Sequence, residues 1–577
     1  TDEIEVNKGV LRPPGMQQQA TFGELAALAA QQAVPGKVTL KKPEAFKLIG
    51  KPHLPRKDTG KTDGSALYTQ DIQLPDMLTA VVSHPPRFGA TLETFDATEA
   101  KALPGVVDVV RVDNAVAVLA QTFWQAKKGR DRLQITWNED KAFQQSTDEL
   151  LKHYHQLAEQ PGTVARKKGD PEAAFKASHQ VVEASYEFPF LAHAAMEPLN
   201  CVVQITDDLV EIWNGTQYQS VDQINVSQLL GITPEQVKIN TTLAGGSFGR
   251  RACVTSDYVL EAARIAKASG KQVPVKLVWT REDDTQGGYY RPMTVHKLKA
   301  GLDKGGNIVA WQHRVVSQSI MTGTLFESGI ENGIDWSSIE GAAMLPYDIP
   351  NLEMELHTVE LPVPVLWWRS VSSTHTAFSA ETFIDELAAI AGQNPLSYRL
   401  KMLKGKPEIP TQIARHQQVL NIVAEKSGWD TPLPEGHARG LALHQSFGTY
   451  VAQVAEISLV GNGEYQIEKV TCVVDCGVAV NPDVVAAQME GGIGFGLSPA
   501  LMSEITFKEG RVEQSNFHDY QVLQMGGMPK VAVHIIPSAE PPSGVGEPGV
   551  PLIAPAVANA LYAATGLPKR RLPFGLT

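Results

Sequence analysis

The sequence predicts a large chain of several mixed domains, of the α/β and α+β classes. Its 577 residues are enough for about three or four domains of ordinary size. Short strand-like runs alternate with helix-prone stretches between residues 56 and 140, which is typical of an α/β domain. The last region, residues 439–577, is rich in strands. These three observations predict the fold class.

Composition and charge exclude several kinds of partner. The formal net charge of -12 argues against nucleic acid or an anionic membrane surface as the main partner. No apolar run reaches the roughly 18 residues that a membrane-spanning helix needs. We therefore expect a chain that does not cross a bilayer.

The cysteines and the first residue carry further expectations. The four cysteines form no Cys-x-x-Cys pair, so we expect this chain to hold neither an iron–sulfur cluster nor a c-type haem by itself. Cys472 and Cys476 lie in a strand-like run and are expected to be small core residues. The chain begins with Thr1 rather than Met, which predicts either processing or a start inside a larger gene product.

The first third of the chain divides into an arm and an α/β segment. Residues 1–50 read as a connecting arm with a short helix at 22–32, and the α/β segment follows at 51–145. Strands are expected in that segment at residues 78–82, 106–112, 115–120 and 133–137. A polar, helix-favouring connector at 146–160 leads into the next region.

A hairpin and a helix start open the second region. Strands at 202–205 and 209–213 are expected to pair, because only a short acidic turn separates them. Thr216 is a residue type that caps helices, and apolar positions recur at helical spacing after it. Gln217 is therefore predicted in the first helical turn, with its amide free to point at a ligand.

A glycine-rich loop follows the next strand. Residues 236–243 predict a strand, Gly245, Gly246, Ser247, Phe248 and Gly249 form the loop, and a helix is expected from residue 257. This arrangement presents backbone N–H groups to an anion. The loop lacks both the nucleoside triphosphate signature and the dinucleotide fingerprint, so it is weak evidence for nucleotide binding. An aromatic residue between glycines suggests a pocket wall.

Arg369 follows two tryptophans and precedes a helix expected from about residue 378. A guanidinium in that position suits a phosphate or an oxo group. A surface cation–π pair with a tryptophan is an equally good interpretation of the residues alone.

Residues 544–559 form the stretch around which the other motifs are organised. Its glycines and prolines place Glu547 on a turn, and a buried helix follows that ends at Gly566. A lone carboxylate before an apolar helix is placed where burial raises its pKa toward neutrality, as a general base requires. By itself, the residue is also well explained as an acid that caps the helix.

Together these segments resemble the molybdopterin-binding large subunit of the xanthine oxidase family of molybdenum hydroxylases. The likeness is greatest to the isoquinoline 1-oxidoreductase beta-subunit branch, which includes related bacterial aldehyde dehydrogenases. It implies an aldehyde oxidase/xanthine dehydrogenase hammerhead domain followed by two molybdopterin-binding domains. The implied segments are the arm 1–50, the hammerhead 51–145, a first molybdopterin-binding domain 160–405, an interdomain segment 406–438, and a second molybdopterin-binding domain 439–577.

The resemblance also implies roles for individual residues. Glu547, after Gly546, matches the catalytic carboxylate, and Gln217 matches the glutamine that hydrogen-bonds the molybdenum oxo group. Arg369 matches an arginine near the cofactor, and Gln488, on an expected helix, matches a glutamine that reaches the pterin. The loop of Gly245, Gly246, Ser247, Phe248 and Gly249 matches the family's Gly-Gly-x-Phe-Gly loop. None of these residues is a metal ligand, because the family holds molybdenum through the pterin dithiolene.

The implied cofactor is molybdenum–molybdopterin, and cytosine dinucleotide is the form usual in bacterial relatives. Electrons are expected to leave through a small partner subunit with two iron–sulfur clusters, since this chain carries none. The family's Met-Gly-Gln-Gly type segment is absent from the sequence. In this branch that segment is permuted to the N-terminal side of the hammerhead. We therefore expect a separate chain to supply it.

The implied reaction is hydroxylation with water as the oxygen source and Glu547 as the base. Aldehyde oxidation to a carboxylic acid is favoured over hydroxylation of an N-heteroaromatic beside its nitrogen. The acid that purine-oxidising members carry after Phe248-Gly249 is missing, and Arg369 precedes Ser370-Val371-Ser372 instead of Gly-Phe-Gly. Both departures argue against a purine substrate and against the aromatic sandwich of the purine enzymes.

Two further alternatives concern activity and location. A non-catalytic binding or assembly relative is disfavoured, because Glu547, Gln217 and the Phe248 loop are all retained. A flavin- or nicotinamide-dependent dehydrogenase would need a dinucleotide fingerprint, which the sequence lacks. Relatives in this branch are often exported after folding, so a periplasmic location is expected ahead of a cytoplasmic one.

Overall fold

The computed structural model describes residues 4–53, 58–405, 409–461 and 463–575. The predicted segments therefore have short parts, at 1–3, 54–57, 406–408, 462 and 576–577, that lie outside the described residues. The chain forms two compact units, Thr1–Ile49 and Gly50–Thr577.

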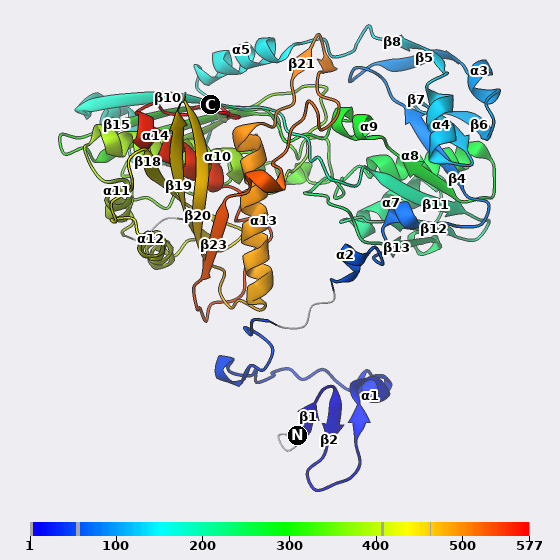
Figure 1. Ribbon diagram of the computed structural model, residues 1–577, viewed down its shortest axis with the longest axis horizontal. Coiled ribbons are helices and arrows are strands. Elements are labelled where there is room, and N and C mark those ends of the chain that lie inside the picture. Colours follow the sequence, from blue (N-terminus) through cyan, green and yellow to red (C-terminus); the bar gives the residue numbers. More distant parts are fainter. Residues whose placement is uncertain (1–3, 54–57, 406–408, 462, 576–577) are drawn as a thin grey trace. The chain divides into compact units, whose positions relative to one another are not determined.

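The smaller unit contains a three-stranded antiparallel sheet and one helix (Figure 1). Its elements are β1 (Glu5–Asn7), β2 (Val10–Arg12), β3 (Ala20–Thr21) and α1 (Phe22–Ala29). Thr21 and Glu24 form a capping box that starts α1, since each side chain bonds the other residue's backbone N–H. The predicted helix is confirmed, and it ends three residues earlier than expected.

A seven-stranded sheet opens the larger unit, in the order β13-β12-β11-β14-β4-β7-β6. Its strands are β4 (Leu78–Ser83), β6 (Val106–Val112), β7 (Ala115–Ala120), β11 (Asn200–Ile205), β12 (Val210–Asn214), β13 (Val237–Thr241) and β14 (Val275–Val278). The predicted hairpin is confirmed, because β11 and β12 pair antiparallel. β4 and β14 pair in parallel, with Leu78 opposite Val275. Strands of the 51–145 segment thus share one sheet with strands of the 160–405 segment.

Helices cover this sheet and a small second sheet adjoins it. The helices are α3 (Thr98–Lys101), α4 (Phe123–Arg130), α7 (Gln219–Leu230), α8 (Asp257–Ser269) and α9 (Arg281–Gln286). β5 (Thr91–Asp96) pairs with β8 (Gln134–Asn138). One face of the large sheet packs against α8, where Tyr258, Val259 and Ala262 are buried.

A five-stranded sheet, in the order β10-β15-β16-β17-β9, follows the connector helix α5 (Thr147–Ala158). Its strands are β9 (Thr163–Lys168), β10 (Gln180–Phe188), β15 (Thr294–Leu302), β16 (Ile308–Ser317) and β17 (Leu352–Thr358). β16 and β17 are parallel, so the chain must cross over between them. The crossover is the long connection 318–351, which returns below as part of the site.

The last sheet has four strands in the order β18-β19-β20-β23. They are β18 (His437–Ser446), β19 (Thr449–Gly461), β20 (Glu464–Asp475) and β23 (Lys530–Ile535). The helices α10 (Ser373–Ile390), α11 (Pro395–Met402), α12 (Ile413–Ser427), α13 (Pro482–Leu501) and α14 (Ile553–Thr565) lie around it (Figure 1). α12 lies in the expected interdomain segment, and its Val419, Leu420 and Val423 are buried in the main core.

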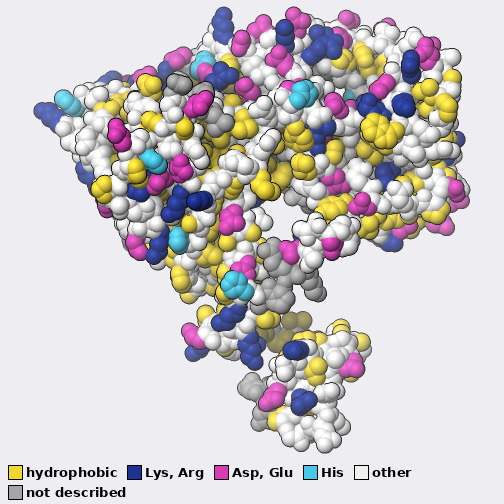
Figure 2. Space-filling model, viewed as in Figure 1, with side chains coloured by type: hydrophobic (Ala, Val, Ile, Leu, Met, Phe, Trp, Pro, Cys, Tyr) yellow, Lys and Arg dark blue, Asp and Glu magenta, His cyan; other side chains and the backbone are white. Residues whose placement is uncertain are grey.

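Remaining short elements and surface features complete the larger unit. The short elements are α2 (Gly60–Asp63), α6 (Pro171–Ala177), β21 (Phe507–Lys508) and β22 (Arg511–Val512). All four cysteines are free and buried, as expected for Cys472 and Cys476. On the face presented in Figure 2, acidic and basic side chains are interspersed, without one large field of a single sign.

Helices α10 and α14 matter most for the site, because the two loops that carry Arg369 and Glu547 lead into them. Asn559 of α14 donates its amide to the carbonyl of Leu441 in β18, with Nδ2 2.9 Å from that oxygen. Gly440, also in β18, lets α14 approach closely: an added Cβ would lie 2.1 Å from the nitrogen of Ala560. The predicted end of α14 at Gly566 is confirmed, with Gly566 in the left-handed conformation (φ 71°).

The close contact at Gly440 gives a prediction about stability. Gly440→Ala should lower the free energy of unfolding by about 1–3 kcal/mol, because the methyl group must push α14 away from β18. Gly526→Ala is the control, since no atom lies within 4 Å of its added Cβ. Urea unfolding of both variants provides the comparison, and equal midpoints would contradict the packing described here.

Candidate functional site

The glycine loop after β13 folds back against the segment that carries Arg369. Gly246 and Gly249 have φ of 100° and 110°, and Phe248 is itself in the left-handed region at 59°. A Cβ on Gly249 would lie 2.4 Å from the carbonyl oxygen of Trp367, so only glycine fits this approach. The backbone N–H of Arg369 donates to the carbonyl of Phe248 at 2.9 Å. The two segments therefore form one rigid wall.

A buried carboxylate anchors the same loop from behind. The N–H of Gly245 donates to Glu197 Oε2 at 2.7 Å, and the N–H of Glu197 donates back to the Gly245 carbonyl at 3.0 Å. Arg251 completes the anchor, with Nη2 3.4 Å from the same carboxylate. Gly245 is thus a support of the loop and, unlike the other predicted residues, does not line the cavity described below.

Gln217 lies just before helix α7 and not in its first turn, so that part of the prediction is wrong. Tyr218 is the residue that precedes the helix, with φ -137° and ψ 53°, and α7 begins at Gln219. Thr216 caps no helical N–H: its hydroxyl accepts from the Tyr218 N–H and donates to Asp222, which tightens the turn. The competing local bonds of the threonine explain the later helix start.

The amide of Gln217 has one end committed and one end free. Ser247 Oγ donates to Gln217 Oε1, and the backbone N–H of Gln217 donates to the Arg251 carbonyl at 3.1 Å. Within the described ranges, Nε2 of Gln217 makes no hydrogen bond. This side chain is therefore oriented as a hydrogen-bond donor toward the cavity.

Glu547 is held by Ser370 from the opposite wall. The N–H of Ser370 donates to Glu547 Oε2 at 2.6 Å, and the hydroxyl of Ser370 donates to the backbone carbonyl of Glu547 at 2.7 Å. Ser370 and Val371 both have positive φ, 80° and 47°. Such a conformation is strained for a β-branched residue and persists only where the surroundings enforce it. Here the two bonds to Glu547 are part of that enforcement.

Arg369 spans the gap between the catalytic loop and helix α13. Its Nε lies 2.8 Å from the carbonyl oxygen of Gly546, and its Nη2 lies 2.9 Å from Oε1 of Gln488. The guanidinium is thus committed to two acceptors and fixes the Glu547 loop against α13. The predicted neighbours Arg369, Gln488 and Gly546 are brought together as one hydrogen-bonded group.

Burial and charge set the ionisation of the site. Burial raises the pKa of Glu547 above its usual value, and the Ser370 N–H and the Arg369 charge oppose that rise only in part. Burial also raises the pKa of Glu340, and the nearby Glu547 adds to this effect. Burial lowers the pKa of Arg369, although Glu547 favours its charged form. The site thus contains a carboxylate whose pKa is moved toward neutrality.

These groups enclose one cavity of about 680 Å³. It is lined by Gln217, Ala244, Gly246, Ser247, Phe248, Gly249, Ala252, Trp367, Trp368, Arg369, Val371, Gln488, Gly546 and Glu547. The sequence motifs that lie more than 300 residues apart along the chain therefore converge on a single space. A carboxylate, a free amide N–H₂ and a glycine-lined backbone wall face one another across it.

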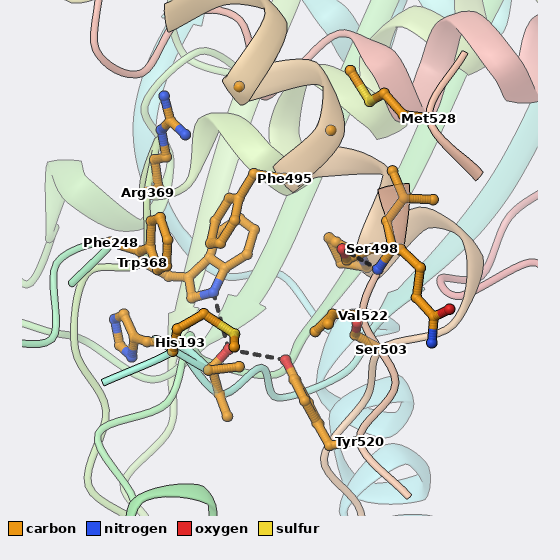
Figure 3. A pocket seen from close by; sticks show the side chains of 18 of the residues that line it. His193, Phe248, Trp368, Arg369, Phe495, Ser498, Ser503, Tyr520, Val522 and Met528 are labelled. Atoms are coloured by element: carbon orange, nitrogen blue, oxygen red, sulfur yellow. Dashed lines mark hydrogen bonds between the residues drawn. The ribbon is translucent and has the colours of Figure 1, made fainter. Parts of the chain in front are cut away.

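An aromatic stack, which the sequence analysis missed, forms one boundary of the cavity. The Phe495 ring lies between two others, 4.3 Å from the centroid of Phe248 and 4.4 Å from that of Trp368, in near-parallel planes. The stack separates the first cavity from a second one of about 650 Å³, shown in Figure 3. Phe495 lies seven residues, or two helical turns, after Gln488 on α13, so helical spacing held a signal for it.

Comparison with known proteins identifies the family. The molybdopterin cofactor-binding domain family matches residues 154–403, and a second molybdopterin cofactor-binding domain family matches residues 379–529. The chain is 31% identical to isoquinoline 1-oxidoreductase subunit beta of Brevundimonas diminuta, over 99% of this chain and 78% of that protein. The chain belongs to the xanthine oxidase family of molybdenum hydroxylases. It is thus a molybdopterin-dependent oxidoreductase.

Further relatives of this molybdenum hydroxylase chain cover it almost completely. It is 29% identical to the membrane-bound aldehyde dehydrogenase [pyrroloquinoline-quinone] of Gluconacetobacter polyoxogenes, over 99% of this chain and 78% of that protein. Among solved structures, quinoline 2-oxidoreductase from Pseudomonas putida 86 aligns with a TM-score of 0.78 and 15% identity, covering 92% of this chain and 97% of that one. This alignment confirms the predicted multidomain fold.

Two searches of the molybdenum hydroxylase chain returned no feature. Across the described ranges, no helix combines the length and apolar character of a membrane span. In the same residues, no three His, Cys, Asp or Glu side chains are grouped as a metal site.

The electrostatics of Glu547 give a prediction about pH. Arg369→Leu removes the positive charge that lowers the Glu547 pKa, so that pKa should rise further, by about one unit. A base acts only when ionised, so the acid limb of a kcat/KM–pH profile should move to higher pH. Arg369→Lys keeps the charge and should move the limb less. An acid limb of Arg369→Leu at the wild-type position or below would contradict the assignment.

Proposed function

We propose that this chain carries the molybdenum cofactor of an enzyme that oxidises an aldehyde to a carboxylic acid, with water as the source of oxygen. The observation that carries the proposal is the half-buried Glu547 carboxylate, whose pKa is raised, across one cavity from the free amide of Gln217. A base next to an electrophilic carbon is what such a reaction requires. The relative from Gluconacetobacter polyoxogenes, named as an aldehyde dehydrogenase, supports the substrate class.

The residues around the cavity fit an oxo-bearing cofactor held without protein ligands. The free Nε2 of Gln217 supplies a donor for an oxo group, and Gly249 keeps the loop backbone clear of side-chain atoms. No atom lies within 4 Å of a Cβ built on Gly546, so this position leaves room beside Glu547. Gln488, fixed by Arg369, would hold the pterin. When bound, the molybdenum cofactor supplies the two-electron oxidation and the oxygen transfer.

The protein's own contribution is the placement of a proton acceptor. Ser370 holds Glu547 Oε2 through its N–H, so the other carboxylate oxygen remains available to accept a proton. The same bond favours the ionised form, while burial keeps the pKa raised and the carboxylate basic. Because the loop is fixed by Arg369 as well, the base has little freedom to leave its position.

Hydroxylation of an N-heteroaromatic beside its nitrogen is the second candidate, and the isoquinoline 1-oxidoreductase relative favours it. A purine is disfavoured by the chain itself. Arg250 is paired with Asp257, and Arg251 with Glu197, so neither arginine after the Phe248 loop is free to bind a polar heterocycle.

We further propose that the cofactor is the cytosine dinucleotide form and that a partner with two iron–sulfur clusters takes the electrons. The name of the Brevundimonas relative, a beta subunit, supports a multi-subunit enzyme. A periplasmic location is proposed ahead of a cytoplasmic one, and cell fractionation with an antibody to the chain tests it.

A separate chain is proposed to supply the missing Met-Gly-Gln-Gly type segment. The second cavity and an adjoining one of about 840 Å³ share Met196, Val522, Leu523, Gln524 and Met528. Met525, beside them, is 95% exposed, and Met196 is 76% exposed. Apolar surface of this kind is typical of a protein interface. We therefore propose that the separate chain covers these methionines.

Replacement of Glu547 tests the proposed base. Glu547→Gln keeps the size of the side chain and removes the ionisable group, so turnover of benzaldehyde should fall by about 10³-fold or more, since general base work alone is worth 10²–10⁴. Molybdenum content, measured by mass spectrometry of the same preparation, should stay at the wild-type level. Retained turnover at full molybdenum content would sink the assignment.

Composition of the purified complex tests the cofactor and the partners together. Native mass spectrometry with metal analysis should find about one molybdenum and about four irons per complex, the latter in two-iron clusters on another polypeptide. An additional chain that carries the Met-Gly-Gln-Gly type segment should be present. An active complex without such a polypeptide would rule out the proposed division of the cofactor site.

A further inference from the structure

Three aromatic side chains meet at the edge of the cavity. Tyr218, Phe326 and Trp367, here called the aromatic collar, have ring centroids 5.9–6.5 Å apart in each pair. The rings of Tyr218 and Phe326 are near-parallel, at 15°, and each is inclined by about 60° to the Trp367 ring. Trp367 lines the cavity, and Tyr218 directly follows Gln217. The collar therefore adjoins the position where a substrate meets the site.

Each ring of the collar is held by a different segment. The carbonyl of Trp367 accepts a bond from Nε2 of His193 at 2.9 Å. The N–H of Tyr218 is held by Thr216. Phe326 belongs to the connection 318–351, in a turn where its N–H lies 3.1 Å from the Thr324 hydroxyl oxygen. Three independent anchors thus converge on one contact.

Packing of the interior does not explain why these rings gather. None of the three belongs to a buried apolar cluster among the residues that the structure describes. Leu325, beside Phe326, is 57% exposed. Apolar surface that remains in water next to a concave site is typical of a ligand contact. The collar has the character of a recognition surface.

The polar groups of the cavity leave recognition to apolar contact. Arg369 is committed to Gly546 and Gln488, and Gln217 Oε1 is committed to Ser247. The remaining wall includes Ala244, Ala252 and Val371, which offer no side-chain hydrogen bond. A substrate rich in hydroxyl or amide groups would lose its water without replacement.

We propose that the aromatic collar selects substrates whose reactive carbon is attached to a flat aromatic ring, by stacking or edge contact with that ring. This inference rests on the proposed function and narrows its substrate class to aryl aldehydes and related planar heteroarenes. Aromatic pairs at these separations gain energy beyond simple burial, so a flat ring is preferred over a saturated ring of the same carbon count.

Benzaldehyde and cyclohexanecarbaldehyde form a matched pair for the test, because they differ in planarity and not in carbon number. Phe326→Leu and Tyr218→Leu keep apolar volume and remove one ring each. Trp124→Leu is the control, since Trp124 is an exposed aromatic on α4, 66% exposed and outside the cavity lining. The readout is the ratio of kcat/KM values for the two aldehydes, in which the fraction of active enzyme cancels.

The collar predicts that the wild-type complex prefers benzaldehyde, and that each leucine variant loses about tenfold of that preference. Trp124→Leu should keep the wild-type ratio. Equal losses for both aldehydes would mean a merely structural role for these rings and would overturn the proposal. So would an unchanged ratio in both collar variants.

Failure of the proposed function would be recognised separately. If the molybdenum-loaded wild-type complex oxidises neither aldehyde, the proposed function is wrong and calorimetric binding of the same two compounds decides on the collar. Tighter binding of benzaldehyde that is weakened in Phe326→Leu supports the collar. Equal binding of the two compounds to the wild-type complex overturns it.

Discussion

The bonds between Ser370 and Glu547 are the contact on which the rest of the site depends. They join the loop before α10 to the loop before α14, and both helices lie in the main buried core. Asn559 of α14 extends the connection by bonding the Leu441 carbonyl of β18. A carboxylate fixed by such elements cannot relax into water without disturbing the core. The strain at Ser370 and Val371 is tolerated for the same reason.

Opposed electrostatic effects keep the carboxylate useful. Burial raises the pKa of Glu547, while the Ser370 N–H and the Arg369 charge stabilise its ionised form. Arg369 does not form a direct ion pair that would quench the base, because its guanidinium is bonded to Gly546 and Gln488. The same residue thus supplies positive charge near the base and fixes the loop that carries it.

Much of this arrangement was predictable because it rests on local chemistry. The glycines around Phe248, the turn that carries Glu547 and the stop at Gly566 all follow from backbone conformations that few other residues adopt. The start of α7 was not predictable from the cap preference of Thr216, since that hydroxyl bonds Asp222 instead. Helix α10 begins at Ser373, five residues before the predicted start, because Ser370 and Val371 end the preceding segment in the left-handed region.

Features made by distant segments escaped the sequence. Phe495 stacks between Phe248 and Trp368, and Phe326 reaches the collar from the connection between β16 and β17. No local pattern reports which rings will meet, because the contacts are set by the packing of three sheets. The same holds for the seven-stranded sheet, where β4 and β14 pair across nearly 200 residues of chain.

The position of the metal tests the central claim most directly. In a crystal structure of the loaded complex, the anomalous signal of molybdenum should lie inside the 680 Å³ cavity, between the Gln217 amide and the Glu547 carboxylate. No side chain of this protein should ligate it. A molybdenum peak outside that cavity, or one ligated by a residue of this chain, would contradict the account.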